Sequence, residues 1–288
     1  MQGIITAVYA SFILAISETS LKRSYRDFEP SVGFFFAALF GLVVWIPLGL
    51  IFGGHFSNFV TVLPYATASA ILAEALYFYA LSKGQLSITA ILLATYPIYT
   101  IFFSHFINHE HVSDKLWPFI ILTIAGTLMS ALPSKLTWSE LKKSGAIAWP
   151  LIAAAAAGFS DAISKHIINR TSSFDFLIAL AIVQIPIALV YLAIQKQKVG
   201  PVIREVRKNP KDYKHALVGG GLSVIGMALF WMSFNYNLAS VVSPILATSS
   251  AIIVLFATLF LDEAMTWKNA LGIAFIFIGV LGISRVVG

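Results

Sequence analysis

Long uninterrupted runs of apolar residues constrain this chain more than any other feature. A helix needs about 20 such residues to cross the roughly 30 Å of hydrocarbon in a bilayer. Ten segments qualify on a window of about 19 residues, and they are residues 2–21, 32–53, 61–83, 87–108, 115–132, 146–167, 174–195, 215–236, 239–261 and 268–286. These runs are too continuous for the alternating strands of a membrane β-barrel. The sequence therefore predicts an all-α integral membrane protein with ten transmembrane helices.

Composition excludes most soluble classes of protein. Hydrophobic residues make up 58% of the chain and charged residues 11%, whereas soluble domains have about 45–50% and about 25%. The chain contains no cysteine and no motif that resembles a nucleotide-binding loop. We expect no cofactor, no bound metal and no nucleic-acid partner. The expected partners are a small-molecule substrate and the lipid bilayer, with the chain as a monomer or homodimer. The uncharged stretch from Met1 to Ala15 is expected to be a retained first helix rather than a signal peptide.

The chain also contains an internal repeat. Shifting it by 153 residues lays residues 73–131 over 226–284 without a gap, and a shift of 143 aligns the first helices of the two halves. The polar matches carry the most weight, and they include Glu18 with Asp161, Lys22 with Lys165, Thr95 with Thr248, Glu110 with Glu263, and Lys115 with Lys268. We place the repeats at residues 1–135 and 136–288.

Each predicted repeat contains five helices. Because five is odd, the second repeat must enter the membrane from the opposite side, which makes the two an inverted pair. Inverted repeats are typical of secondary transporters, whose binding site lies near the middle of the membrane between the repeats.

Several motifs are similar to those of a known family. The segments Leu246–Thr248 and Leu259–Glu263, followed by Gly272 and Gly279, resemble the closing helices of EamA-type members of the drug/metabolite transporter superfamily. Lys22 and Lys165 stand where that family often has a lysine late in the first helix of each repeat. The aromatic-glycine-serine pattern that often opens the family's first helix reads Leu14–Ser17 here. The resemblance implies five plus five helices and transport of a metabolite.

Together these features predict a secondary active transporter, not an enzyme. It would move a small organic metabolite across the membrane by alternating access, with coupling to protons as an option. The alternatives are an ion or metal channel or transporter, and an intramembrane enzyme.

Charge distribution predicts the orientation. Of the 19 Lys and Arg residues, 15 lie in or beside the connections after predicted helices 1, 3, 5, 7 and 9, and seven of them fall between Lys196 and Lys214. The positive-inside rule places these connections in the cytoplasm and both termini outside. The expected location is the plasma membrane.

Glu74 is the sharpest candidate for a functional residue, because it lies near the middle of predicted helix 61–83. An ionisable group within a span is costly and is usually functional or paired. The functional interpretation is a carboxylate that binds a cation or carries a proton, and the alternative is a structural partner for a neighbouring lysine or hydroxyl.

Two further acids precede a lysine by four residues, Glu18 with Lys22 and Asp161 with Lys165. This spacing places each acid and base on one helix face. They would form two related charge pairs facing the cavity, or self-neutralising pairs near helix ends with lysines reaching the interface.

Softer candidates are aromatic and amide side chains that suit a small-molecule site, and they are Tyr77, Tyr96, Gln184, Trp231, Asn235 and Asn237. A metal-like cluster comprises His105, His109, Glu110 and His111. We interpret this cluster as a polar helix end, because its counterpart in the second half retains only the acid.

Overall fold

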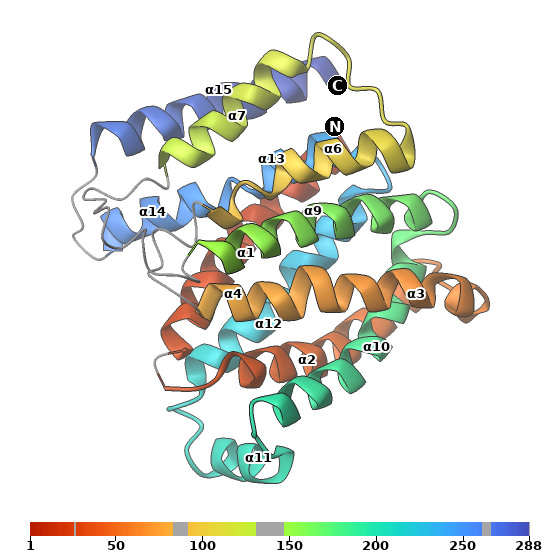
Figure 1. Cartoon of the computed structure of the whole chain (residues 1–288), viewed down its shortest axis with the longest axis vertical. Coiled ribbons are helices and arrows are strands. Elements are labelled where there is room, and N and C mark those ends of the chain that lie inside the picture. The colour runs from red at the N-terminus through yellow and green to blue at the C-terminus, as the bar shows by residue number, and fades with distance from the viewer. Residues whose placement is uncertain (26, 83–91, 131–146, 261–265, 288) are drawn as a thin grey trace.

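The computed structural model describes residues 1–25, 27–82, 92–130, 147–260 and 266–287, and in this part of the chain it contains helices and no strands. The all-α prediction is confirmed for these residues. Figure 1 shows the helices lying side by side in a layered bundle, with the two termini close to one another. The capping-box spacing of Thr137 and Glu140, with apolar and basic residues around them, predicts a short surface helix at residues 136–143, and this segment lies outside the described residues.

The first half begins with two long helices, α1 (Gln2–Ser24) and α2 (Pro30–Ile51). Pro30 occupies the first turn of α2, where a missing N–H costs nothing because that group has no helical partner. The third stretch is composite, and the half then closes with two shorter helices. These elements are η1 (Phe56–Asn58), α3 (Phe59–Ser69), the π-helix η2 (Ala70–Ala75), α4 (Leu76–Ser82), α6 (Tyr96–Asn108) and α7 (Trp117–Ser130).

The second half follows the same order. It contains α9 (Ala148–Ile168), α10 (Ser173–Ile194), the short α11 (Val199–Lys208), α12 (Lys214–Ser233), α13 (Ala239–Leu246), α14 (Ser249–Phe260) and α15 (Trp267–Val287). The hydroxyl of Ser172 caps α10 by accepting from the Asp175 amide at 3.0 Å, which satisfies one of the free N–H groups at the helix start.

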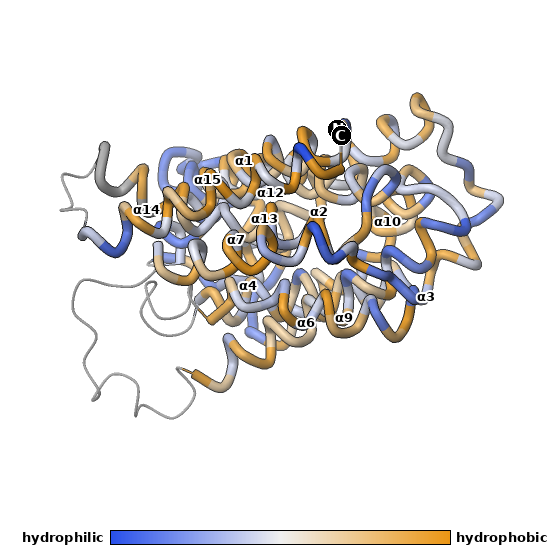
Figure 2. The backbone as a smooth tube through the Cα atoms, turned by 90° about the horizontal axis from the view of Figure 1, so that it is seen from above, coloured by the Kyte–Doolittle hydropathy of each residue, from blue (hydrophilic) through white to orange (hydrophobic). Residues whose placement is uncertain are grey.

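Seven stretches among the described residues are long and apolar enough to cross a membrane. They are Gln2–Ser24, Pro30–Ile51, Phe56–Ser82, Ala148–Ile168, Ser173–Ile194, Lys214–Ser233 and Trp267–Val287, and two shorter apolar helices are Trp117–Ser130 and Ala239–Ile253. Figure 2 shows hydrophobic residues running along most of the helical bundle. The structure thus supports several membrane spans, while the count of ten remains a prediction.

Helix α1 has an exposed apolar face and an opposite face that is buried in the protein. Ile5, Tyr9, Phe12 and Ile16 are exposed, and their spacing places them on one face of the helix. The opposite face, which includes Ala10, is buried. A continuous exposed apolar face of this kind suits contact with lipid hydrocarbon.

The helix pairs with the most extensive contacts join one half of the chain to the other. These pairs are α1 with α12, α7 with α15, α6 with α9, and α2 with α10. Glycine makes the first pair close, since a Cβ at Gly226 would lie 2.6 Å from Leu14 Cγ and one at Gly219 would lie 2.7 Å from Leu21 Cγ. Small residues permit such close approach between membrane helices. The two halves therefore interlock rather than forming separate units.

Two predicted helices are interrupted, which corrects their expected continuous form. Predicted helix 239–261 breaks at Ala247–Thr248 between α13 and α14, and predicted helix 87–108 has a turn at Ala94–Thr95 before α6. At both breaks the threonine hydroxyl bonds the carbonyl three residues earlier, from Thr95 to Leu92 at 2.6 Å and from Thr248 to Ile245 at 2.7 Å. Such side-chain bonds compete with the helical ladder. The breaks occupy equivalent positions, 153 residues apart.

Candidate substrate cavity between the two halves

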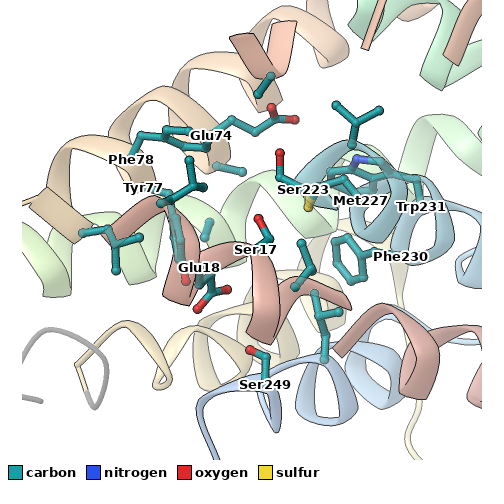
Figure 3. A pocket seen from close by; sticks show the side chains of 18 of the residues that line it. Ser17, Glu18, Glu74, Tyr77, Phe78, Ser223, Met227, Phe230, Trp231 and Ser249 are labelled. Atoms are coloured by element: carbon teal, nitrogen blue, oxygen red, sulfur yellow. The ribbon is translucent and has the colours of Figure 1, made fainter. Parts of the chain in front are cut away.

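A cavity of about 900 Å³, counting the space at its mouth, lies where α1, α4, α9 and α12 meet. Seven of the eleven residues expected at the site line it, and they are Glu18, Glu74, Tyr77, Tyr96, Asp161, Gln184 and Trp231. Figure 3 shows the side chains from α1, α4 and α12 facing the same space.

Equivalent positions of the two halves line this cavity together. Glu18 on α1 corresponds to Asp161 on α9 under the shift of 143 residues, and both are lining residues. Under the shift of 153 residues the lining pairs are Glu74 with Met227, Tyr77 with Phe230, Phe78 with Trp231, and Tyr96 with Ser249. The cavity therefore lies at the contact between the two repeated sequences.

Glu74 lies in the π-helix η2, in the middle of the third helical stretch. The side chain is 6% exposed, and its Oε2 accepts a hydrogen bond from the Gln184 amide of α10. Its Oε1 and the Gln184 Oε1 are buried without a partner. Short π-helices within α-helices occur frequently at functional sites. Here the π-helix presents a buried carboxylate to the cavity with one oxygen uncommitted.

The two equivalent acids have different surroundings. Asp161 accepts hydrogen bonds from the hydroxyls of Thr100 at 3.0 Å and Ser243 at 2.8 Å. Glu18 lies beside the phenol of Tyr77. Asp161 is thus hydrogen-bonded to residues near the two helix breaks. Glu18 instead lies beside Tyr77, which follows Glu74 by about one helical turn.

The expected charge pairs are not formed. In the described part of the chain, Lys22 donates to the Leu81 carbonyl at 2.7 Å and Lys165 donates to the Phe234 carbonyl, instead of pairing with Glu18 and Asp161. Leu81 and Phe234 are equivalent residues at the ends of α4 and α12. A cation near the free carbonyls of a helix C-terminus is favourable. Each lysine therefore joins the first helix of its half to the third, and neither is among the described residues that line the cavity.

Asn235 also has a role outside the cavity. Its amide nitrogen donates to Ser173 Oγ at 2.7 Å, and its oxygen accepts from the Ser173 amide at 3.1 Å. These bonds connect the end of α12 to the start of α10. Tyr96 does line the cavity, and its hydroxyl donates to the Ser243 carbonyl at 2.9 Å.

Sequence reasoning missed several lining residues. Met227, Phe230 and Ser249 were not proposed, although each is the repeat equivalent of a residue that was. Projecting the candidates from one half onto the other would have found them. Trp45 was missed for a different reason, because none of the candidates proposed in the second half is its repeat equivalent. Its indole N–H donates to the Val224 carbonyl at 2.8 Å.

The cavity has different surroundings at its two ends. Toward the start of α1, Trp231 packs against Phe176, Phe230 and Phe234 with ring centroids 4.9, 4.7 and 5.5 Å away. All four rings are buried. Toward the end of α1, a smaller second cavity shares Glu18, Tyr77 and Tyr96 with the first and continues past Thr19 to Ile253.

The histidine-rich segment at residues 105–111 contains Glu110, whose carboxylate caps helix α13. The carboxylate of Glu110 accepts from the amides of Ala239 and Ser240 at 3.0 Å each, and from the Ser240 hydroxyl at 2.6 Å. It thereby satisfies free N–H groups at the start of α13. Among the described residues, no three His, Asp or Glu side chains are grouped so that they could hold a metal ion. The matching residue Glu263 lies outside the described residues.

Comparison with known proteins decides the family. The EamA-like transporter family matches residues 1–132 and again residues 144–285. The chain belongs to this family. EamA-like proteins are membrane transporters, so the chain is an integral, multi-pass membrane transporter of the drug/metabolite transporter superfamily.

One solved structure, titled only "Crystal structure of protein", is similar at a TM-score of 0.72 and 13% sequence identity. The match covers 99% of this chain and 98% of the other. At this identity the likeness shows a shared fold alone and carries no information on substrate. A search of curated proteins finds no match.

The lysine caps give a first prediction. Replacing Lys165 with methionine removes its hydrogen bond and leaves the buried Phe234 carbonyl without that donor. A hydrogen bond to a charged group contributes about 1.5–3 kcal/mol. We expect Lys165→Met to lower the midpoint of thermal unfolding in detergent clearly. Lys115→Met, at an exposed lysine, is the control and should change stability by no more than about 0.5 kcal/mol. Equal midpoints for the two variants would contradict the capping role.

Proposed function

We propose that the protein is a secondary active transporter that moves a small organic metabolite by alternating access. The observation that carries this proposal is the cavity lined by equivalent residues of both halves. A site shared by two halves can be exposed to either side when the halves move relative to each other.

The proposed topology is ten spans in two inverted repeats of five, at residues 1–135 and 136–288. The seven long apolar stretches and the two shorter ones support it. So do the matching lysine caps and the matching breaks at Thr95 and Thr248. Interrupted helices near the substrate site recur in transporters with inverted repeats. The nearness of the two termini agrees with an even number of crossings (Figure 1).

The two ends of the cavity suggest how access alternates. The buried cluster of Trp231, Phe176, Phe230 and Phe234 closes the end toward the start of α1. The second cavity extends the other end. In the proposed cycle, movement between the halves separates this aromatic cluster and closes the space around Glu18 and Tyr96.

Glu74 is the proposed coupling residue. Its carboxylate is buried, faces the cavity and has one oxygen without a partner. A carboxylate in this position can bind a proton in one half of the cycle and release it in the other. Met227, its counterpart in the second half, cannot do this, so the repeat supplies no second carboxylate at the equivalent position.

The test uses purified protein in proteoliposomes loaded with a metabolite extract, with exchange followed by mass spectrometry. We expect saturable, protein-dependent exchange that a pH gradient drives. Glu74→Gln should lower the gradient-driven rate at least about tenfold, equivalent to about 1.4 kcal/mol. The reason is that an amide keeps the shape of the side chain and cannot carry a proton at this position.

Glu29→Gln is the matched control, because Glu29 is exposed at the start of α2. It should transport as the unchanged protein does. Full gradient-driven exchange by Glu74→Gln would contradict the coupling role of Glu74. Flux without saturation or counterflow would favour a channel, and chemical conversion of an added compound would favour an enzyme.

We also propose that the connections rich in Lys and Arg face the cytoplasm, as the positive-inside rule indicates. Helix α11 and its flanks hold seven of these residues between Lys196 and Lys214. The chain has no native cysteine, so a cysteine at the exposed Ile203 of α11 reports its side. We expect no labelling of Ile203→Cys by an impermeant thiol reagent in intact cells, and labelling after lysis. Labelling in intact cells would reverse the orientation.

A further inference from the structure

The charged side chains among the described residues that line the cavity are all acidic. Glu18, Glu74 and Asp161 line the main cavity, and none of the described residues that line either cavity is lysine, arginine or histidine. The lysines one turn away on α1 and α9 are bound to the carbonyls of Leu81 and Phe234. Acidic side chains therefore line this space, whereas the nearest lysine side chains are hydrogen-bonded outside it.

The three acids are not equally available to a ligand. Asp161 already accepts from two hydroxyls, and Glu18 lies beside the Tyr77 phenol. Glu74 accepts from Gln184 at one oxygen and has no partner at the other, although the side chain is 6% exposed. An ionised carboxylate buried without a partner is costly, and a cation removes that cost.

Aromatic side chains form much of the remaining wall. Trp45, Tyr77, Phe78, Tyr96, Phe230 and Trp231 all line the main cavity. Figure 3 shows Tyr77 and Phe78 on the same side of the space as Glu74, and Phe230 and Trp231 across it. Aromatic faces attract organic cations, most strongly where water is excluded. Apolar groups attached to the cation would also be buried against these rings.

An inorganic ion fits this lining less well. Metal ions need several oxygen or nitrogen ligands that converge on one point. Among the described residues, no three His, Asp or Glu side chains are grouped so that they could hold a metal ion. The cavity is also much larger than a single ion needs.

We infer that the cavity binds a monovalent organic cation, an ammonium group carried on an aromatic or apolar body, with Glu74 as its counter-ion. This inference rests on the proposed transport function, because it names the substrate class of the same cavity. Trp231, whose indole N–H is buried without a partner, lies at the other side of the space from Glu74 (Figure 3). It supplies a ring face and a hydrogen-bond donor to the body of the substrate.

Four probes of similar size and different charge test the inference. They are phenethylammonium, 3-phenylpropanamide, 3-phenylpropionate and phenylalanine, which are a cation, a neutral amide, an anion and a zwitterion. Binding to the purified full chain is followed by intrinsic tryptophan fluorescence, because Trp45 and Trp231 line the cavity. We expect phenethylammonium to bind at least about tenfold more tightly than each of the other three.

Variants then locate the counter-ion. Glu74→Gln should weaken phenethylammonium binding at least about tenfold and leave binding of the neutral amide within about twofold. The control Glu29→Gln should match the unchanged protein. The charge series on the unchanged protein stands on its own if Glu74→Gln fails to fold.

Four results would overturn the inference. They are equal binding of the amide, tighter binding of either probe that carries a carboxylate, no binding of phenethylammonium at millimolar concentration, and a folded Glu74→Gln that retains full affinity for the cation. Failure of the transport proposal looks different. In that case phenethylammonium binds as expected but is not exchanged in proteoliposomes. Saturable exchange of neutral or anionic metabolites alone would instead preserve the transport function and reject the substrate class.

Discussion

Close approach between helices of opposite halves is the constraint on which the rest of this structure depends. Gly219 and Gly226 let α12 lie against α1, where a side chain would collide with Leu21 and Leu14. The Ser17 hydroxyl adds a hydrogen bond to the Gly219 carbonyl at 2.8 Å in the same interface. In a bilayer, apolar burial does not drive helices together as it does in water, so close packing and such bonds matter more. Because each half packs on the other, the cavity exists only in the assembled chain.

Duplication explains which features of the two halves are alike. The Lys22 and Lys165 caps and the Thr95 and Thr248 breaks are repeated at equivalent positions. All four of these residues shape helices, and none of them is among the described residues that line the two cavities. The halves differ inside the cavity, where Glu74 faces Met227 in the alignment and Tyr77 faces Phe230. The backbone framework is thus symmetric, while the proposed chemistry is concentrated in the first half.

Hydropathy and the repeat predicted much of the fold and of the cavity. Apolar length located the long helices, and an acid in mid-span marked Glu74. The charge pairs were wrong because spacing on one helix does not reveal a carbonyl offered by another, as Leu81 and Phe234 offer theirs to the lysines. The breaks at Thr95 and Thr248 were also missed. They depend on local hydroxyl bonds that hydropathy does not register.

The π-helix could not be predicted either. Nothing in the run Ala70–Ala75 distinguishes it from an ordinary helical turn, and its register depends on the helices packed around it. The capping role of Glu110 has the same origin. Its partners Ala239 and Ser240 lie far along the chain, and they come close only because the halves interlock.

In the proposed transporter, both halves of the chain build one ligand site. A single cysteine at Met227, in the second half, tests this directly in a chain that has no other cysteine. Its rate of reaction with a cationic methanethiosulfonate reagent is measured with and without phenethylammonium, whose proposed counter-ion Glu74 belongs to the first half. We predict that ligand at about ten times its dissociation constant slows this reaction about tenfold, while a cysteine at Ile203 on α11 reacts unchanged. An unaltered rate at Met227→Cys under saturating ligand would contradict a ligand site shared by the two halves.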